Sequence, residues 1–105
     1  MMKISSTPLA EVAVVETTPR RDHRGVFARL FCIHELSSII GQRRIVQINH
    51  SHTHLVGAVR GMHYQHPPHA EMKLVRCLKG RVWDVAVDLR AGSPTFLQWH
   101  AVELI

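Results

Sequence analysis

His63 and Lys73 are the residues of this chain whose types best suit proton transfer at carbon. A lysine that faces a cavity beside a histidine suits removal of a proton from a carbon next to a ketone. His63 would act as the general base near neutral pH, and the Lys73 ammonium would stabilise the enolate oxygen. Taken singly, a buried Lys or His is more often held in a structural hydrogen bond, and that interpretation stays open.

Further polar residues alternate along a segment just before His63. Gln47, Asn49 and Ser51 lie two residues apart, so in an extended strand they share one side. A row of amide and hydroxyl groups suits a ligand with many hydroxyl groups. The alternative is that these groups pair with a neighbouring sheet edge or loop.

Two arginines could bind phosphate. Arg24 follows Asp22 in a polar turn, and Arg60 precedes Gly61 in the segment that holds His63. A guanidinium fork matches the geometry of phosphate oxygens. Strict alternation places Arg60 opposite His63 unless Gly61 marks a bulge.

The segment from Gly57 to Gln65 resembles the first cupin motif, in which a His-x-His pair and a spaced Glu bind a metal. In this chain Gln65 stands at the second histidine position, and Lys73 stands at the glutamate position, with six residues between it and Gly80. An ammonium group repels a divalent ion and offers no lone pair. We therefore expect no metal at that site and an anion, fixed or transient, in its place.

The chain also has nine histidines, which keeps a metal-dependent alternative open. His50, His52 and His54 alternate, but they share a face only if a strand continues through them. A second series, at positions 63, 66 and 69, is interrupted by two prolines, which break regular structure. The spacing favours a structural zinc only weakly.

These residues must be positioned by short strands. The β-prone runs are separated by Gly, Pro, Asp or His and cover residues 12–15, 26–31, 45–48, 59–64, 74–78, 82–89 and 96–99. A helix of about two turns is predicted over residues 34–40, before Gly41. Lys79 and Gly80 predict a tight hairpin that joins 74–78 to 82–89. Alternation in 82–89 places Asp84 and Asp88 together on a face that carries acids. The pattern predicts an all-β sandwich or barrel.

The bulk composition agrees with one domain over residues 1–105. The chain is 46% hydrophobic and has a net charge of +5, which favours anionic partners. The basic residues are scattered among few aromatic residues, which argues against nucleic-acid binding. No apolar run reaches the about 18 residues of a membrane span. Cys32 and Cys77 lie in apolar stretches, as free thiols of a reducing cytoplasm do.

Several ordered motifs together resemble one family, the dTDP-4-dehydrorhamnose 3,5-epimerases. They are Arg60-Gly61-Met62-His63-Tyr64-Gln65, Lys73-Leu74-Val75-Arg76-Cys77, Val82-Trp83-Asp84-Val85-Ala86-Val87-Asp88-Leu89-Arg90 and Gly92-Ser93-Pro94-Thr95-Phe96. Upstream, Asp22-x-Arg24-Gly25-x-Phe27 and Gln47-x-Asn49-x-Ser51 also match. The similarity runs from about Val12 to the end and identifies the chain with the N-terminal half of such an enzyme.

The resemblance implies a cupin-type β-sandwich or jelly roll, here incomplete, with one short helix. It implies a homodimer and cofactor-free epimerisation at C3, C5 or both of dTDP-4-dehydro-6-deoxyglucose. By that similarity His63 is the base and Lys73 stabilises the enolate. The substrate would be bound by phosphate contacts from Arg24 and Arg60, by nucleotide contacts from Gln47 and Asn49, and by stacking of Phe27 on thymine.

Two departures from the family pattern define the alternative. Arg29 stands where the family usually has a Glu near the nucleotide base. The tyrosine acid, the aspartate that orients the base and a further histidine belong to the family's second half and have no counterpart among these residues. The alternative function is therefore a non-catalytic nucleotide-sugar-binding or dimerisation remnant.

Overall fold

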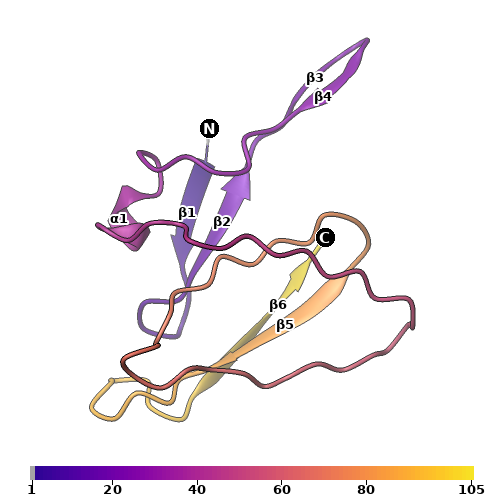
Figure 1. Ribbon diagram of the computed structural model, residues 1–105. Helices are drawn as coiled ribbons and strands as arrows, with labels where there is room; N and C mark the ends of the chain where they lie inside the picture. The colour runs from indigo at the N-terminus through magenta and orange to yellow at the C-terminus, as the bar shows by residue number, and fades with distance from the viewer. Residues whose placement is uncertain (1) are drawn as a thin grey trace.

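The computed structural model describes residues 2–105 and consists of short antiparallel strand pairs with one helical turn (Figure 1). The elements in chain order are β1 (Met2–Ser6), β2 (Ala13–Thr17), β3 (Arg20–Asp22), β4 (Gly25–Phe27), α1 (Ser37–Ile40), β5 (Val82–Val87) and β6 (Trp99–Leu104). Three separate two-stranded sheets result: β1 with β2, β3 with β4, and β5 with β6. The all-β prediction with one short helix is confirmed.

The first sheet is a hairpin whose turn is closed by side chains. In β1 and β2 the register pairs Met2 with Thr17 and Ser6 with Ala13. Beyond Ser6, the Thr7 hydroxyl donates to the Val12 carbonyl at 2.8 Å and accepts the Leu9 N–H at 3.2 Å. The turn therefore satisfies its own backbone groups. The sequence patterns identified β2 but missed β1.

The buried apolar side chains of the described residues lie at two places. Leu9 is in the β1–β2 turn, and Leu36 and Ile40 belong to the helical turn and its start, at 3%, 0% and 8% exposure. The Met2 N–H also donates to the Glu35 carboxylate at 3.0 Å, which joins the start of β1 to the residues before α1. The helix is shorter than the predicted 34–40, but it ends at Gly41 as expected. Gly41 has φ 64° and donates its N–H to the Ser37 carbonyl.

The predicted hairpin between 74–78 and 82–89 is wrong. Residues 74–78 form no strand, and β5 pairs instead with β6, with Val82 opposite Leu104 and Val87 opposite Trp99. The turn conformation at Gly80 (φ 89°) is present, but it joins a loop to β5. The run 96–99 is likewise mostly a turn, and β6 begins at its last residue. Strand pairing depends on residues far apart in the sequence, so a glycine that favours a turn does not decide which strand pairs with β5.

Residues 42–81 cross the molecule as a long open loop without strands (Figure 1). The runs 45–48 and 59–64 were predicted as strands and are not; of the run 26–31, only Val26 and Phe27 lie in a strand, β4. Along this loop Val46 and Ile48 are 87% and 86% exposed, and Cys77 is the one half-buried side chain. A strand requires a neighbour for its backbone hydrogen bonds, and none lies beside this loop in residues 2–105.

Candidate functional site

The predicted site residues lie on two separate parts of the molecule. Five of the seven, Gln47, Asn49, Arg60, His63 and Lys73, belong to the loop of residues 42–81. The other two lie at the β3–β4 hairpin, which projects from the body of the molecule (Figure 1). Within residues 2–105 no hydrogen bond, ion pair or ring contact joins any two of the seven. The prediction of a shared site therefore stays a prediction.

The β3–β4 hairpin presents Arg24 in a defined orientation. Asp22 accepts hydrogen bonds from the Arg24 backbone N–H and from Nη2, both at 2.8 Å, and from Nε at 3.5 Å. Hydrogen bonds from the Arg24 side chain and backbone lower the pKa of Asp22. This pairing occupies one edge of the guanidinium and leaves Nη1 and the outer edge for an anion. Phe27, in β4, is 65% exposed and free to stack on a flat ligand.

The loop residues are exposed and make mainly local contacts. Lys73 Nζ lies 3.6 Å from Glu71 Oε1, and Arg60 Nη2 donates to the Thr53 hydroxyl at 3.2 Å. His63 is exposed, with Gly61 near its ring. Two hollows in the described residues lie elsewhere: one of about 460 Å³ is lined by residues 38–43, in and just after α1, and one of about 330 Å³ lies beside Arg90. Neither is lined by a predicted site residue.

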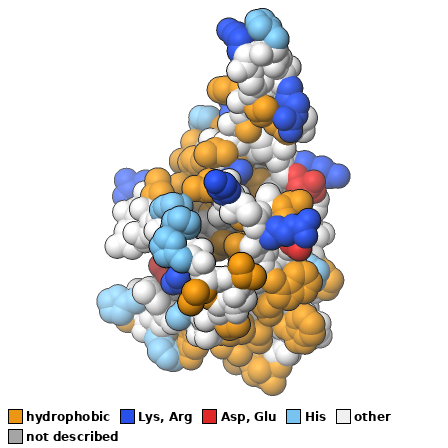
Figure 2. Space-filling model, turned by 90° about the vertical axis from the view of Figure 1, so that its right-hand side faces the viewer, with side chains coloured by type: hydrophobic (Ala, Val, Ile, Leu, Met, Phe, Trp, Pro, Cys, Tyr) orange, Lys and Arg blue, Asp and Glu red, His pale blue; other side chains and the backbone are white. Residues whose placement is uncertain are grey.

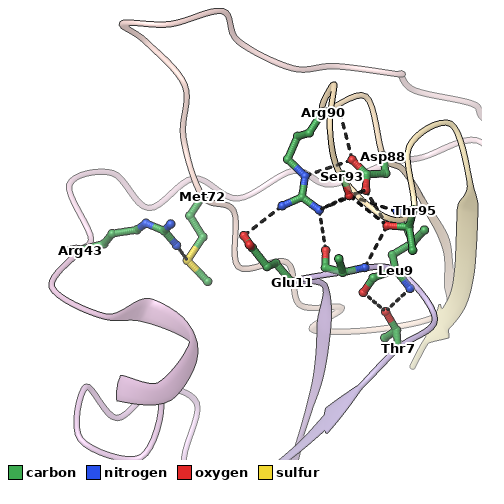
Figure 3. Close-up of polar contacts among 10 residues, drawn as sticks. Thr7, Leu9, Glu11, Arg43, Met72, Asp88, Arg90, Ser93 and Thr95 are labelled. Atoms are coloured by element: carbon green, nitrogen blue, oxygen red, sulfur yellow. Dashed lines mark hydrogen bonds and ion pairs between the residues drawn. The ribbon is translucent and has the colours of Figure 1, made fainter.

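The most densely bonded polar group is one that the sequence patterns misplaced. Asp88 was expected beside Asp84 on a face that carries acids, but it is 5% exposed while Asp84 is exposed. Its Oδ2 accepts the hydroxyl protons of Ser93 at 2.5 Å and Thr95 at 2.6 Å (Figure 3). Its Oδ1 accepts the Arg90 backbone N–H and Nε, each at 3.0 Å. The sequence does contain a signal for this cluster. In the spacing Asp-x-Arg-x-x-Ser-x-Thr, an aspartate is followed at short intervals by three side chains that can donate hydrogen bonds to it.

This cluster closes the β5–β6 connection and ties it to the first hairpin. The Asp88 backbone bonds Leu97 and Gln98 across the loop, at 2.7 and 2.9 Å. Arg90 Nη2 donates to the Ala10 carbonyl at 2.8 Å, and the Ala10 N–H donates to the Thr95 hydroxyl at 3.1 Å (Figure 3). The cluster therefore holds together two sheets that share no strand, and its role is structural.

The same hydrogen bonds set the charge state of Asp88. Donation from Arg90, then from Ser93 and Thr95, holds the pKa of Asp88 far below its usual range. A carboxyl whose pKa is lowered by folding stabilises the folded state above its unfolded pKa of about 4. That stabilisation is lost progressively as the pH falls below about 4 toward the folded value.

Replacing Asp88 by Asn is expected to lower the melting temperature by about 5–10 °C at pH 7, since two hydroxyl donors and Arg90 lose their shared anion. The measurement is thermal unfolding followed by circular dichroism. Asp84→Asn is the matched control, because Asp84 lies exposed in β5, the strand that ends one residue before Asp88. The difference between wild type and Asp88→Asn should shrink as the pH falls from 4 to 2. A difference that stays constant over this range would contradict the assigned cause.

Arg29, the position singled out in the sequence, has a structural partner. Its Nη1 lies 2.6 Å from Glu35 Oε2, and Thr17 donates its hydroxyl to the Arg29 carbonyl at 2.7 Å. Hydrogen bonding to Glu35 raises the pKa of Arg29, and the same pair lowers the pKa of Glu35. Arg29 therefore joins the chain after β4 to the residues before α1.

The family model described as dTDP-4-dehydrorhamnose 3,5-epimerase matches residues 6–105. Curated proteins of that name are 40% identical over 103 residues in Sinorhizobium fredii and 41% identical over 104 residues in Shigella flexneri. Each match covers 98% of this chain but 53% and 57% of those proteins. The chain spans about half the length of the curated relatives it matches.

Solved structures agree with the sequence matches. The crystal structure of dTDP-4-dehydrorhamnose 3,5-epimerase from Bacillus anthracis, with TDP and PPi bound, aligns with a TM-score of 0.92 at 35% identity. That alignment covers 99% of this chain and 59% of the other. The enzyme of that name from Elizabethkingia anophelis aligns with a TM-score of 0.84 at 41% identity and covers 98% of this chain and 56% of that one. These matches confirm the predicted fold class, an incomplete cupin-type β-sandwich.

Proposed function

Because the chain belongs to the dTDP-4-dehydrorhamnose 3,5-epimerase family, we propose that it binds a dTDP-4-dehydro-6-deoxyhexose and serves its epimerisation at C3, C5 or both, in deoxysugar biosynthesis. The observation that carries the proposal is the match over residues 6–105, together with a structure of TM-score 0.92 that has TDP and PPi bound. One relative at 41% identity, from Streptomyces niveus, is named a 3-epimerase, so the choice of carbon is left open.

The chemistry follows from the two residues of the loop. His63 takes the proton from the carbon beside the C4 ketone, and the electron pair of that bond moves into the carbonyl to form an enolate. The Lys73 ammonium stabilises the negative oxygen. Return of a proton to the opposite face of the carbon inverts its configuration. No metal or organic cofactor is needed, because the ketone itself delocalises the charge.

Substrate binding is assigned to the remaining residues. Arg24 and Arg60 hold the phosphates, Gln47 and Asn49 bind the nucleotide, and Phe27 stacks on the base. In the described residues 44–80, only two hydrogen bonds join backbone groups within the loop. The Ala58 N–H donates to the Leu55 carbonyl, and the His69 N–H donates to the His66 carbonyl. A segment with so few backbone bonds can rearrange around a ligand at low cost, and the proposal requires the loop to bring His63 and Lys73 together.

A homodimer in the cytoplasm completes the proposal. Trp83, Val87 and Trp99 lie on one face of the β5–β6 sheet, and the two tryptophans are 68% and 66% exposed. Figure 2 shows hydrophobic side chains gathered over the lower part of the molecule. Such a surface favours a protein partner, and a second copy of the chain is the one we propose. Light scattering that gives the mass of a monomer at micromolar concentration would contradict the homodimer.

The proposed cytoplasmic location agrees with the cysteines. Cys32 and Cys77 are both free, which suits a reducing compartment. No helix among residues 2–105 is long and apolar enough to cross a membrane.

The test is incubation of the purified chain with dTDP-4-dehydro-6-deoxyglucose in heavy water. Deuterium at C3 and C5 is followed by mass spectrometry and NMR. Uptake with an inverted product is the result expected for an epimerase. Uptake without inversion would mean that the base works and the acid is missing. Binding of dTDP without uptake would support the alternative, a non-catalytic binding remnant, and sink the proposed catalysis.

Arg24 offers a separate test of binding. We expect Arg24→Ala to weaken dTDP binding by about tenfold, because a charge-assisted phosphate contact is lost. Asp22→Asn should weaken binding less, since Arg24 keeps its charge but loses the partner that orients it. Isothermal titration with dTDP measures both. Arg21→Ala is the control, because Arg21 lies on the same exposed hairpin without an assigned role. Equal losses in Arg21→Ala and Arg24→Ala would mean that only net charge matters.

A further inference from the structure

Two histidines outside the proposed site lie with their rings in contact. The ring centroids of His52 and His54 are 4.5 Å apart with an interplanar angle of 51°. Both residues are exposed and lie on the loop of residues 42–81, outside any helix or strand. The ring contact places the two side chains on the same side of the chain. Figure 2 shows histidine side chains gathered on one face of the molecule.

The separation of the two rings suits a shared metal ion. Zinc–imidazole bonds are about 2.0–2.1 Å, and the ring centre lies about 1.1 Å beyond the ligating nitrogen, so each centroid lies about 3.2 Å from the ion. Two adjacent ligands at about 90–109° then place their centroids about 4.5–5.2 Å apart. The observed 4.5 Å falls at the short end of this range.

The surrounding contacts leave both histidine rings available. Within residues 2–105, neither His52 nor His54 has a hydrogen bond or ion pair, so their ring nitrogens are free for an ion. Thr53, between them, accepts a hydrogen bond from Arg60 Nη2 at 3.2 Å, and the Ala58 N–H bonds Leu55 at 3.3 Å. These contacts involve Thr53, Arg60 and the backbone after His54, and they occupy neither histidine ring.

We propose that His52 and His54 form a two-imidazole chelate for a divalent transition ion, with water in the remaining positions. Among residues 2–105 no group of three or more His, Cys, Asp or Glu side chains could hold a metal, so the chelate is an open one. Its affinity should follow the order of imidazole sites, with Cu²⁺ and Ni²⁺ above Co²⁺ and Mn²⁺. The chelate is independent of the epimerase proposal and supplies no group to that reaction.

The test is isothermal titration of the tag-free chain with NiCl₂. We expect one ion per chain, displaced by free imidazole, and at least a tenfold loss of affinity, or about 1.4 kcal/mol, in the double variant His52→Ala/His54→Ala. The matched control is His66→Ala/His69→Ala, which removes the same number of exposed histidines from the same loop. Because all four side chains are exposed, circular dichroism of each variant should match the wild type.

Three outcomes would overturn the chelate. They are the absence of Ni²⁺ binding to the wild type, unchanged binding in His52→Ala/His54→Ala, and an equal loss in the control variant, which would mean that scattered histidines bind the ion collectively. None of the three touches the epimerase proposal, because His63 and Lys73 are intact in every variant.

Discussion

Replacing His63 by Ala is expected to reduce deuterium uptake beside the ketone by about 100- to 10,000-fold, the usual contribution of a positioned general base. Binding of dTDP should stay within about twofold, because the imidazole is assigned to the sugar carbon and not to the nucleotide. The measurement is the rate of deuterium incorporation from heavy water, beside a titration with dTDP. His63 is exposed, so its loss should leave the melting temperature unchanged.

His66→Ala is the control for this experiment. His66 lies three residues further along the same loop, is exposed, and its ring contacts that of Tyr64, with ring centroids 4.9 Å apart. It therefore reports any general effect of removing an imidazole. Equal exchange in wild type and His63→Ala would sink the assignment of the base, even if the chain proved to be an epimerase.

The local parts of the fold could be predicted from the sequence. The β2 run, the β5 run and the turn at Gly41 each follow from residues within a few positions, and all three are present. The strand partner of β5 could not be predicted. Lys79-Gly80 is a strong local turn signal, whereas pairing with β6 requires a loop of residues 88–98 that the buried Asp88 holds closed. That stabilisation depends on donors brought together by folding, which a strand pattern does not contain.

For the candidate site, too, the sequence could predict some features and not others. Residue types and motif order were sufficient to identify the family, which the matches over residues 6–105 confirm. The sequence could not say whether His63 and Lys73 meet, because that depends on which strands lie beside residues 42–81. In the described structure this loop has exposed apolar residues and no paired strand. Alternation along 45–48 and 59–64 therefore indicates a sheet that these residues do not form by themselves.

Replacing Lys73 by Met is expected to slow deuterium uptake by about 100- to 1,000-fold, comparable to the loss of one donor to a developing oxyanion. The ammonium lies 3.6 Å from Glu71, and the two side chains are 50% and 42% exposed. Exposed ion pairs contribute little to stability, so Lys73 can leave Glu71 for the enolate at small cost. Lys73→Arg should recover part of the rate, since the positive charge is kept at a different distance.

Glu71→Gln separates the two roles open to Lys73. If Lys73 serves the enolate, freeing it from Glu71 should leave uptake unchanged or raise it, while Lys73→Met abolishes most of it. If Lys73 acts only through its ion pair, Glu71→Gln and Lys73→Met should reduce uptake by the same factor. The ratio of the two rates, measured in heavy water with saturating substrate, therefore decides whether the cation or the pair is required.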